Sequence, residues 1–329
     1  MPAVDRSSVG LYVHVPFCAT LCGYCDFFRV RAEAGVPEGY EDLLLAEAEA
    51  YASDPPVHVD TVYFGGGTPS LLEPPRLKRL MEGLSSRFRL DPAAEVTLEA
   101  NPETVTFEAL AAWEGAGVNR LSIGVQSLDA AVLGLLGRRA GPEQALRAVA
   151  LAAARGFEHL SADVIEGVPG QSAASSLADV SQLALLPIDH LSAYGLDLHG
   201  GTPLMDRVVR GELALPDDDE AAETYMAVHH RLRGFGFEHY EVSNFARAGG
   251  RCAHNLRYWQ GGDTIGLGPS AWTRFRGRLA GNVRDLAKWA AAVGSREPAF
   301  ESVEELTEVR RKEDALIFGL RVSDGVALE

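Results

Sequence analysis

The chain has 329 residues, 47% of them hydrophobic, which is enough to bury a large core in one domain or in two. Its 46 acidic residues outnumber its 30 basic residues and give a net charge of -16, so broad binding to the phosphate backbone of nucleic acids is not expected. No apolar run approaches the ~18 residues that cross a bilayer, and the first ten residues lack the pattern of a signal peptide. We therefore expect a cytoplasmic protein without a transmembrane segment.

Short β-rich runs alternate with helical patterns along the first two thirds of the chain. The expected strands are residues 9–16, 59–67, 94–101, 120–127, 159–169 and 190–198. The clearest helical patterns between them are residues 39–52, 74–88 and 141–156. This alternation predicts right-handed crossovers and a parallel sheet. Because six units are fewer than the eight of a closed barrel, we predict an α/β fold with an incomplete parallel (β/α)6 barrel, whose active face is formed by the loops at the carboxyl ends of the strands.

The alternation ends after an acid-led helical pattern at residues 214–237. The stretch that follows is irregular, aromatic and rich in glycine, which indicates a second unit packed on the first. We therefore predict a core domain at residues 1–235 and a smaller carboxyl-terminal unit at residues 236–329. We expect this second unit to be incomplete, because the sequence stops shortly after a turn-like Asp324-Gly325 pair.

Three of the four cysteines, Cys18, Cys22 and Cys25, follow the first expected strand in the spacing C-x3-C-x2-C. Three thiolates on one loop can hold three corners of a [4Fe–4S] cube and leave one iron open to a small molecule. A zinc site and incidental core cysteines are the alternatives. Structural zinc usually takes four closed ligands, and no second C-x2-C or local histidine pair supplies a fourth. Core cysteines would not usually gather at the end of a strand, so the pattern favours the cluster.

The cysteine spacing, with an aromatic residue before the last cysteine, resembles the signature of the radical S-adenosylmethionine (SAM) superfamily. Further segments resemble its HemN/HemW group and together span nearly the whole chain: "LYVHVPFC", "YFGGGTPSLL", "EANPE", "NRLSIGVQS", "GVPGQS", "YEVSNFA", "HNLRYW" and "GLGPSAW". The resemblance implies a radical SAM barrel in which SAM chelates the open iron through its amino and carboxylate groups. The cofactor then carries the chemistry, while the protein supplies position and electrostatics.

The same resemblance implies contacts for individual residues that lie at or beyond the strand ends. It assigns the amino end of SAM to Gly66, Gly67 and Thr68, the methionine and ribose to Glu99 and Gln126, the carboxylate to Arg138, a polar contact to Asp163, and packing near the cluster and adenine to Tyr12 and Tyr24. A tight glycine turn and a solvated polar rim are the alternatives for these positions. Where the family usually has an acid after the sixth strand, this chain has His199, and we assign that position no contact.

The segment "CAHNLRYW", residues 252–259, is the candidate heme-binding segment. Histidine is a common axial ligand of heme iron, so His254 is the predicted ligand, and the flat rings of Tyr258 and Trp259 suit a porphyrin. A capped turn whose aromatic side chains fill the junction between the two units is the alternative. Cys252 and His254 could form half of a zinc site, but no partner pair is visible. By resemblance, His-Asn-x-x-Tyr-Trp marks the HemW branch, which is proposed to bind heme.

Two functions follow from this resemblance. The first is a heme chaperone that binds heme and passes it to an acceptor protein, with an electron donor for the cluster. The alternative is the oxygen-independent coproporphyrinogen III oxidase, which decarboxylates two propionates. The oxidase group usually has a further cysteine as Cys-x-Cys and a long amino-terminal extension, whereas here Asp26 and Phe27 follow Cys25 and eleven residues precede Tyr12. Because "HNLRYW" is also present in full, we favour the chaperone.

Overall fold

A computed structural model describes residues 7–326 of the chain. The first six residues, on which the signal-peptide expectation partly depends, and the last three lie outside the described residues. One sheet runs through the molecule in the order β14-β13-β12-β11-β1-β4-β5-β6-β7-β8-β10-β9, and β2 and β3 form a separate parallel pair. Its strands are β1 (Val9–Val15), β4 (His58–Gly66), β5 (Arg89–Ala100), β6 (Arg120–Gln126), β7 (His159–Glu166), β8 (His190–Gly195), β9 (Glu238–Glu241), β10 (Asn244–Ala246), β11 (Thr264–Leu267), β12 (Trp272–Phe275), β13 (Arg278–Asn282) and β14 (Phe300–Glu305).

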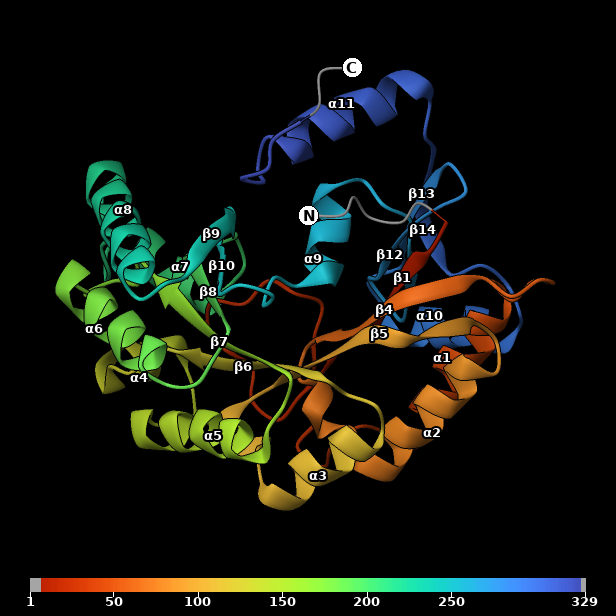
Figure 1. The fold of residues 1–329 in the computed structure, drawn as a ribbon, viewed down its shortest axis with the longest axis horizontal. Coiled ribbons are helices and arrows are strands. Elements are labelled where there is room, and N and C mark those ends of the chain that lie inside the picture. The colour runs from red at the N-terminus through yellow and green to blue at the C-terminus, as the bar shows by residue number, and fades with distance from the viewer. Residues whose placement is uncertain (1–6, 327–329) are drawn as a thin grey trace.

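The six strands predicted from the sequence are β1 and β4 to β8, and all of them run parallel. The sheet curves like a horseshoe with most of its helices on the convex side (Figure 1). The predicted incomplete parallel barrel is therefore confirmed. The helices are α1 (Tyr40–Glu49), α2 (Pro74–Ser85), α3 (Phe107–Gly115), α4 (Ala130–Leu136), α5 (Pro142–Arg155), α6 (Ala173–Ala184), α7 (Pro203–Val209), α8 (Asp218–Gly234), α9 (Ala253–Trp259), α10 (Leu286–Gly294) and α11 (Glu308–Gly319), with short 3-10 turns η1 (Pro69–Leu71) and η2 (Pro102–Thr104).

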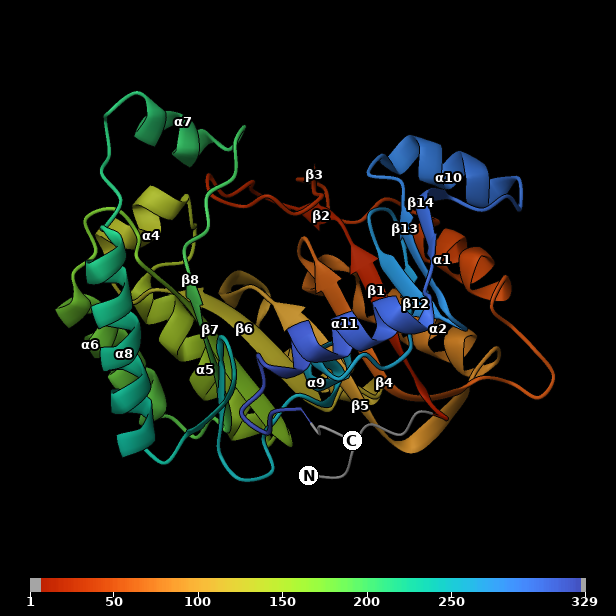
Figure 2. The ribbon, with the colours of Figure 1, turned by 90° about the horizontal axis from the view of Figure 1, so that it is seen from above.

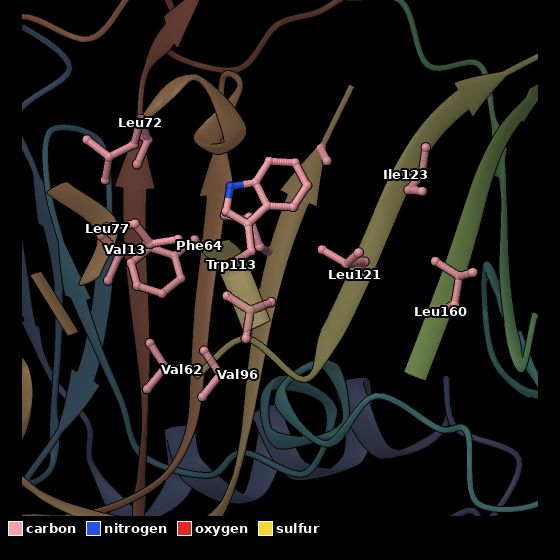
Figure 3. Packing of buried hydrophobic residues seen from close by; sticks show 14 of the residues in the cluster. Val13, Val62, Phe64, Leu72, Leu77, Val96, Trp113, Leu121, Ile123 and Leu160 are labelled. Carbon is pink, nitrogen blue, oxygen red and sulfur yellow. The ribbon is translucent and has the colours of Figure 1, made fainter. Parts of the chain in front are cut away.

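The convex face of the sheet carries the apolar core. Neighbouring strands place apolar side chains side by side, as in the register Val13–Phe64–Leu98–Leu121. Figure 3 shows several of these side chains beneath Trp113 of α3. Because successive residues of a strand point to opposite faces, the positions between them face the lumen of the barrel. Most of those positions are polar or aromatic, which provides the lumen with ionisable groups.

Helix α8 shows why the local sequence starts helices where it does. The side chain of Asp217 accepts a hydrogen bond from the backbone N–H of Glu220, and the Glu220 side chain accepts one from the N–H of Asp217. This reciprocal pair satisfies two donors that an α-helix otherwise leaves free at its start. The acid-led helix predicted from the sequence is confirmed, and it begins at Asp218.

The part of the chain after residue 235 is more regular than the sequence suggested. Strand β11 pairs in parallel with β1, from Gly10 opposite Thr264 to Val13 opposite Leu267, and β12 to β14 continue the same sheet by antiparallel pairing. Helix α9 lies on the concave side of the sheet, and α11 lies beyond it, so both fill the gap between the two ends of the horseshoe (Figures 1 and 2). None of the helices in the described part of the chain combines the length and apolar character needed to span a membrane.

Candidate functional site

The cysteine loop lies at the carboxyl ends of the barrel strands, directly after β1. The pairing of β2 (Phe17–Cys18) with β3 (Val30–Arg31) closes its base. At its middle, the N–H of Gly23 donates to the Leu136 carbonyl at 3.2 Å, and the Gly23 carbonyl accepts from the Leu204 N–H at 2.9 Å. The loop is therefore fixed by backbone bonds to two neighbouring helical segments, independently of anything that the thiols bind.

All three thiols of this loop are free, and they lie within electrostatic reach of one another. Burial raises the pKa of the Cys18 thiol, and the nearby Cys25 and Cys22 raise it further, while a hydrogen bond from Thr68 lowers it. The Thr68 hydroxyl lies 3.6 Å from the Cys18 sulfur, and the Arg138 guanidinium lies 3.8 Å from the Cys22 sulfur. Donors directed at sulfur stabilise thiolates, so the donor set fits a sulfur-ligated metal centre.

A second guanidinium supports the backbone of the same loop. Arg29 donates to the Cys22 carbonyl at 2.9 Å and also to the Cys25 carbonyl. Among residues 7–326, no three His, Cys, Asp or Glu side chains converge as ligands of a single metal ion. The three cysteines nevertheless supply three free thiols on one loop, with donors directed at two of the sulfurs, and this donor chemistry fits an iron–sulfur cluster.

The glycine turn after β4 packs tightly against this loop. A Cβ atom on Gly67 would lie 2.7 Å from the carbonyl carbon of Pro16, so only glycine fits there. Gly66 has a φ of 114°, in the left-handed region that favours glycine. The N–H of Gly66 donates to Glu99 at 3.2 Å, and the N–H of Gly67 donates to Val15 at 2.9 Å. Because an ammonium group donates hydrogen bonds, the turn would bind one through its carbonyl oxygens.

Glu99 faces the lumen beside this turn. It accepts a hydrogen bond from the Tyr63 hydroxyl at 2.8 Å as well as the one from Gly66. Burial raises the pKa of Glu99 to about 7, against the lowering effect of the Tyr63 bond. A carboxyl group with this pKa can accept or donate near neutral pH, which suits a contact with ribose hydroxyls or an ammonium group.

Asp163 lies further along the lumen and ties three strands together. Its carboxylate accepts from Ser122 of β6 at 2.7 Å, from Ser161 of β7 at 3.0 Å and from Ser192 of β8 at 2.7 Å. Burial raises its pKa, while the three serine bonds lower it. Much of the hydrogen-bonding capacity of Asp163 is therefore used within the protein, and little remains for a ligand.

Gln126 and Arg138 lie together near the cysteine loop. Arg138 donates to Asn101 Oδ1 and to the Gly124 carbonyl, each at 2.8 Å, in addition to its contact with Cys22. Gln126 adopts a left-handed φ of 69°, and its amide lies so close to Gly124 that a Cβ there would be 2.7 Å from Nε2. These contacts place both predicted residues at the carboxyl edge of β6.

The two predicted tyrosines occupy different surroundings. Tyr12 faces the lumen from β1, where its ring stacks on Tyr63 with centroids 6.2 Å apart and its hydroxyl lies 3.1 Å from His14 Nδ1. Tyr24 lies in the cysteine loop and packs on a small apolar cluster that includes Leu136 and Leu204. Of these two predicted tyrosines, Tyr12 alone faces the lumen beside Tyr63 and Glu99.

The structure counts against His254 as a heme ligand. The residue lies in α9 and is 1% exposed, and both ring nitrogens have partners: Nδ1 lies 2.9 Å from Thr61 Oγ1 and Nε2 lies 3.1 Å from the Tyr258 hydroxyl. Burial lowers its pKa to about 3, so the imidazole is neutral. An axial ligand needs an accessible nitrogen. In this conformation heme iron could reach His254 only by breaking one of these bonds, so we withdraw it as the ligand.

Helix α9 closes the amino-terminal end of the lumen, which the sequence did not reveal. Glu95 of β5 accepts from the backbone N–H groups of Ala253 and His254 at 3.1 and 3.0 Å. Arg120 of β6 forms an ion pair with Glu95 at 2.8 Å and donates to the Gly250 carbonyl at 3.1 Å. Charged residues within two predicted strands were the available signal, since a charge inside a buried strand needs a partner. We call this arrangement of α9 with Glu95 and Arg120 the plug.

Two remaining positions of interest lie apart from the cysteine loop and the residues around the glycine turn. His199 is exposed in the loop after β8, where its Nε2 lies 3.3 Å from Asp197. Cys252 is buried at the start of α9, and its sulfur donates to Glu95 at 3.4 Å. Cys252 therefore belongs to the plug and lies apart from the cysteine loop in the fold.

Comparison with known proteins gives a consistent result. Residues 12–180 match the family model described as "Radical SAM superfamily". The chain is 47% identical over 268 residues to the heme chaperone HemW of Mycobacterium tuberculosis, a match that covers 80% of this chain and 68% of that protein. It is 40% identical over 272 residues to the heme chaperone HemW of Escherichia coli, covering 82% of this chain and 70% of that protein.

A solved structure supports the fold. The coproporphyrinogen III oxidase HemN of Escherichia coli, described as a radical SAM enzyme, superposes with a TM-score of 0.82 at 24% sequence identity. The match covers 97% of this chain and 76% of that one. At this identity the similarity establishes a shared architecture and leaves the reaction open.

Proposed function

This chain belongs to the radical SAM superfamily and, within it, to the HemN/HemW group, and from that premise we propose that it is a heme chaperone that carries a SAM-ligated [4Fe–4S] cluster. The observation that carries the proposal is the 47% identity, over 80% of the chain, to a protein named as a heme chaperone. The cargo would be heme, and the partners would be an acceptor protein and an electron donor for the cluster.

Cys18, Cys22 and Cys25 would hold the cluster. Their loop is fixed by backbone bonds, and their thiols are free. Thr68 and Arg138 donate toward two of the sulfurs, which favours the thiolate form needed for iron binding. When bound, the cluster supplies electrons one at a time to the SAM that occupies its open iron. The thiols stay free in a reducing compartment, which is the basis for proposing the cytoplasm.

The residues around the glycine turn would position SAM. Carbonyl oxygens of Gly66 and Gly67 would accept from its amino group, and Glu99 lies within hydrogen-bonding distance of the same turn. Arg138 lies beside a proposed cluster ligand and carries the charge that a SAM carboxylate needs. The other proposed contacts are those of Gln126 with polar groups of SAM, of Thr68 with its amino end and of Tyr12 with the neighbourhood of the adenine. Asp163 would have only the capacity that its three serine bonds leave, and Tyr24 would pack beside the cluster from the cysteine loop.

The boundary between a radical SAM core, residues 1–235, and a carboxyl-terminal unit, residues 236–329, also remains our proposal. The β/α alternation ends with α8, which supports a boundary there. The pairing of β11 with β1 joins the two parts in one sheet, so we expect them to unfold together.

The test is reconstitution under anoxia followed by two assays on the same sample. Hemin binding is followed by absorbance, and transfer is measured by adding an apo-globin as acceptor. Coproporphyrinogen III turnover with SAM and a reductant is measured in parallel. We expect heme binding and transfer without porphyrinogen turnover. Sustained turnover would replace the chaperone with the oxidase, and the absence of both activities would refute the proposed function.

A further inference from the structure

A cavity of about 510 Å³ lies in the gap between the two ends of the curved sheet. It is bounded by residues of β8 and β10 on one side, of β11 to β13 on the other, and by α9 and α11. Figures 1 and 2 show α9 and α11 spanning this gap. Its volume falls in the range of ligand sites, roughly 300–1,000 Å³. The plug lies at the amino-terminal end of the lumen and the proposed cofactor residues lie at its carboxyl-terminal end. Neither set gives this lateral cavity a function.

The walls of the cavity are aromatic and unusually exposed. Trp272 is 53% exposed and Tyr258 is 42% exposed, although both line a concave surface. Trp259 and Phe318 add two further rings, with centroids 6.2 Å apart. Exposed aromatic side chains gathered in one cavity indicate a ligand with a flat apolar face.

The rim of the same cavity is basic, in a chain whose net charge is -16. Among the described residues, three arginines line it, against two acidic residues, Asp314 and Glu241. Arg274 and Arg310 pair with Asp314 at 2.8 and 3.0 Å, and Arg310 also lies 3.9 Å from Glu304. Arg321 lies 5.8 Å from the ring centroids of Trp259 and Phe318, and it also lines the cavity. Guanidinium groups with unused donors beside aromatic walls suit a flat ligand that carries carboxylates.

Tyr258 connects the cavity to the plug. Its ring lines the cavity, and its hydroxyl lies 3.1 Å from Nε2 of the buried His254. The other ring nitrogen of His254 lies 2.9 Å from the Thr61 hydroxyl, which fixes the orientation of the imidazole. A phenol oxygen is a known ligand of ferric heme, and a neutral imidazole behind it can orient the phenol through this hydrogen bond.

We propose that this cavity is the heme site and that the hydroxyl oxygen of Tyr258 is the ligand of ferric heme iron, with His254 as a positioning residue behind it. This inference rests on the proposed heme-chaperone function and specifies where on the chain heme binds. The porphyrin lies against Trp272 and Trp259, and its propionates face Arg321 and Arg274. On binding, an iron–oxygen bond forms, the O–H bond of Tyr258 breaks, its proton is released to solvent, His254 stays neutral and the iron stays ferric.

The experiment compares hemin titrations of the reconstituted full chain and three variants. Tyr258→Phe keeps the ring and removes the oxygen, so we expect the tyrosinate-to-iron charge-transfer band and resonance Raman modes to disappear and binding to weaken at least about tenfold. Trp272→Leu removes one wall and should weaken binding several-fold without changing the ligand bands. Tyr225→Phe is the matched control: the Tyr225 hydroxyl also lies 3.3 Å from a histidine nitrogen, that of His239, but Tyr225 does not line the cavity.

The possible outcomes distinguish a failure of the proposed heme site from a failure of the proposed chaperone function. If wild-type protein and Tyr258→Phe bind hemin with the same affinity and spectrum, the site proposed here is wrong while the chaperone function stands. If wild-type protein binds no hemin, the function itself fails. Iron content and circular dichroism report whether each variant folds. Should Tyr258→Phe fail to fold, unchanged hemin affinity in Trp272→Leu would overturn the cavity, and weakened affinity would support it.

Discussion

The two ends of the barrel lumen carry similar kinds of side chains and use them differently. At the amino-terminal end, Glu95 pairs with Arg120 and accepts a hydrogen bond from the backbone N–H of His254, while Arg120 also donates to the Gly250 carbonyl. These bonds hold α9 in place. At the carboxyl-terminal end, Thr68 and Arg138 direct donors at cysteine sulfurs. A motif rich in histidine, arginine and aromatic residues can therefore be a structural plug, and a binding site is better recognised by donors that point at atoms able to bind a ligand.

The strongest test of this comparison is to remove a thiol from each end. Changing Cys18, Cys22 or Cys25 to Ala should abolish the brown chromophore and bound iron after anaerobic reconstitution, because three ligands are the fewest that hold the cluster with one iron open. Cys252→Ala should retain both, since Cys252 belongs to the plug. Iron and sulfide analysis checks the result. Loss of the cluster in Cys252→Ala with retention in Cys18→Ala would reverse the roles of the two ends.

The next test breaks the plug. Arg120→Leu leaves the buried carboxylate of Glu95 without its ion-pair partner, which should cost about 3–5 kcal/mol of unfolding free energy. The matched control is Arg147→Leu, whose side chain is 70% exposed and whose partner Glu143 is 90% exposed. That change should stay within about 0.5 kcal/mol. Urea unfolding of both variants measures the difference, and equal costs would show that the ion pair does not hold the plug.

The sequence predicts the central barrel well because its strands follow a local rule. The apolar residues Val13, Phe64 and Leu98 alternate with residues that face the lumen, and that alternation is visible without any partner strand. The cysteine loop is equally local, since its three cysteines lie within eight residues. Both features could be located before the fold was known.

The rest depends on long-range pairing that local pattern does not reveal. Strand β11 has four residues, and its pairing with β1 joins positions about 250 residues apart, as between Gly10 and Thr264. The identity of His254 is visible in the sequence, whereas its burial against Thr61 depends on where α9 docks. Residue type therefore indicated a ligand at a position whose surroundings make it structural.

A smaller effect is expected where the glycine turn meets the cysteine loop. Gly67→Ala places a Cβ 2.7 Å from the Pro16 carbonyl carbon, so either the turn or the loop must move. Overpacking of this kind costs about 1–3 kcal/mol, and we expect reduced iron content per chain while the protein remains folded. Gly134→Ala in α4 is the control, because an added Cβ there meets no atom within 4 Å. Full iron content in Gly67→Ala would show that the turn does not position the cluster loop.

The smallest effect concerns a carboxyl group at the carboxyl end of β7, and it tests whether every polar group at that end is involved in binding. Glu166 is 5% exposed, and its Oε1 has no hydrogen-bond partner among the residues that the structure describes. Burial raises its pKa to about 8, whereas an unfolded glutamate has a pKa of about 4.3.

Between these two pKa values the unfolded chain is ionised at Glu166 while the folded chain keeps the proton, so this residue makes stability fall as pH rises through that window. Glu166→Gln removes the titration. Relative to wild type, the variant should therefore gain stability between pH 5 and pH 8, by about 1–3 kcal/mol. Urea unfolding at both pH values measures the gain, with Glu143→Gln as the exposed control that should show none. A difference between Glu166→Gln and wild type that does not change with pH would mean that Glu166 already ionises in the folded protein, and that an unidentified partner stabilises its charge at this end of the barrel.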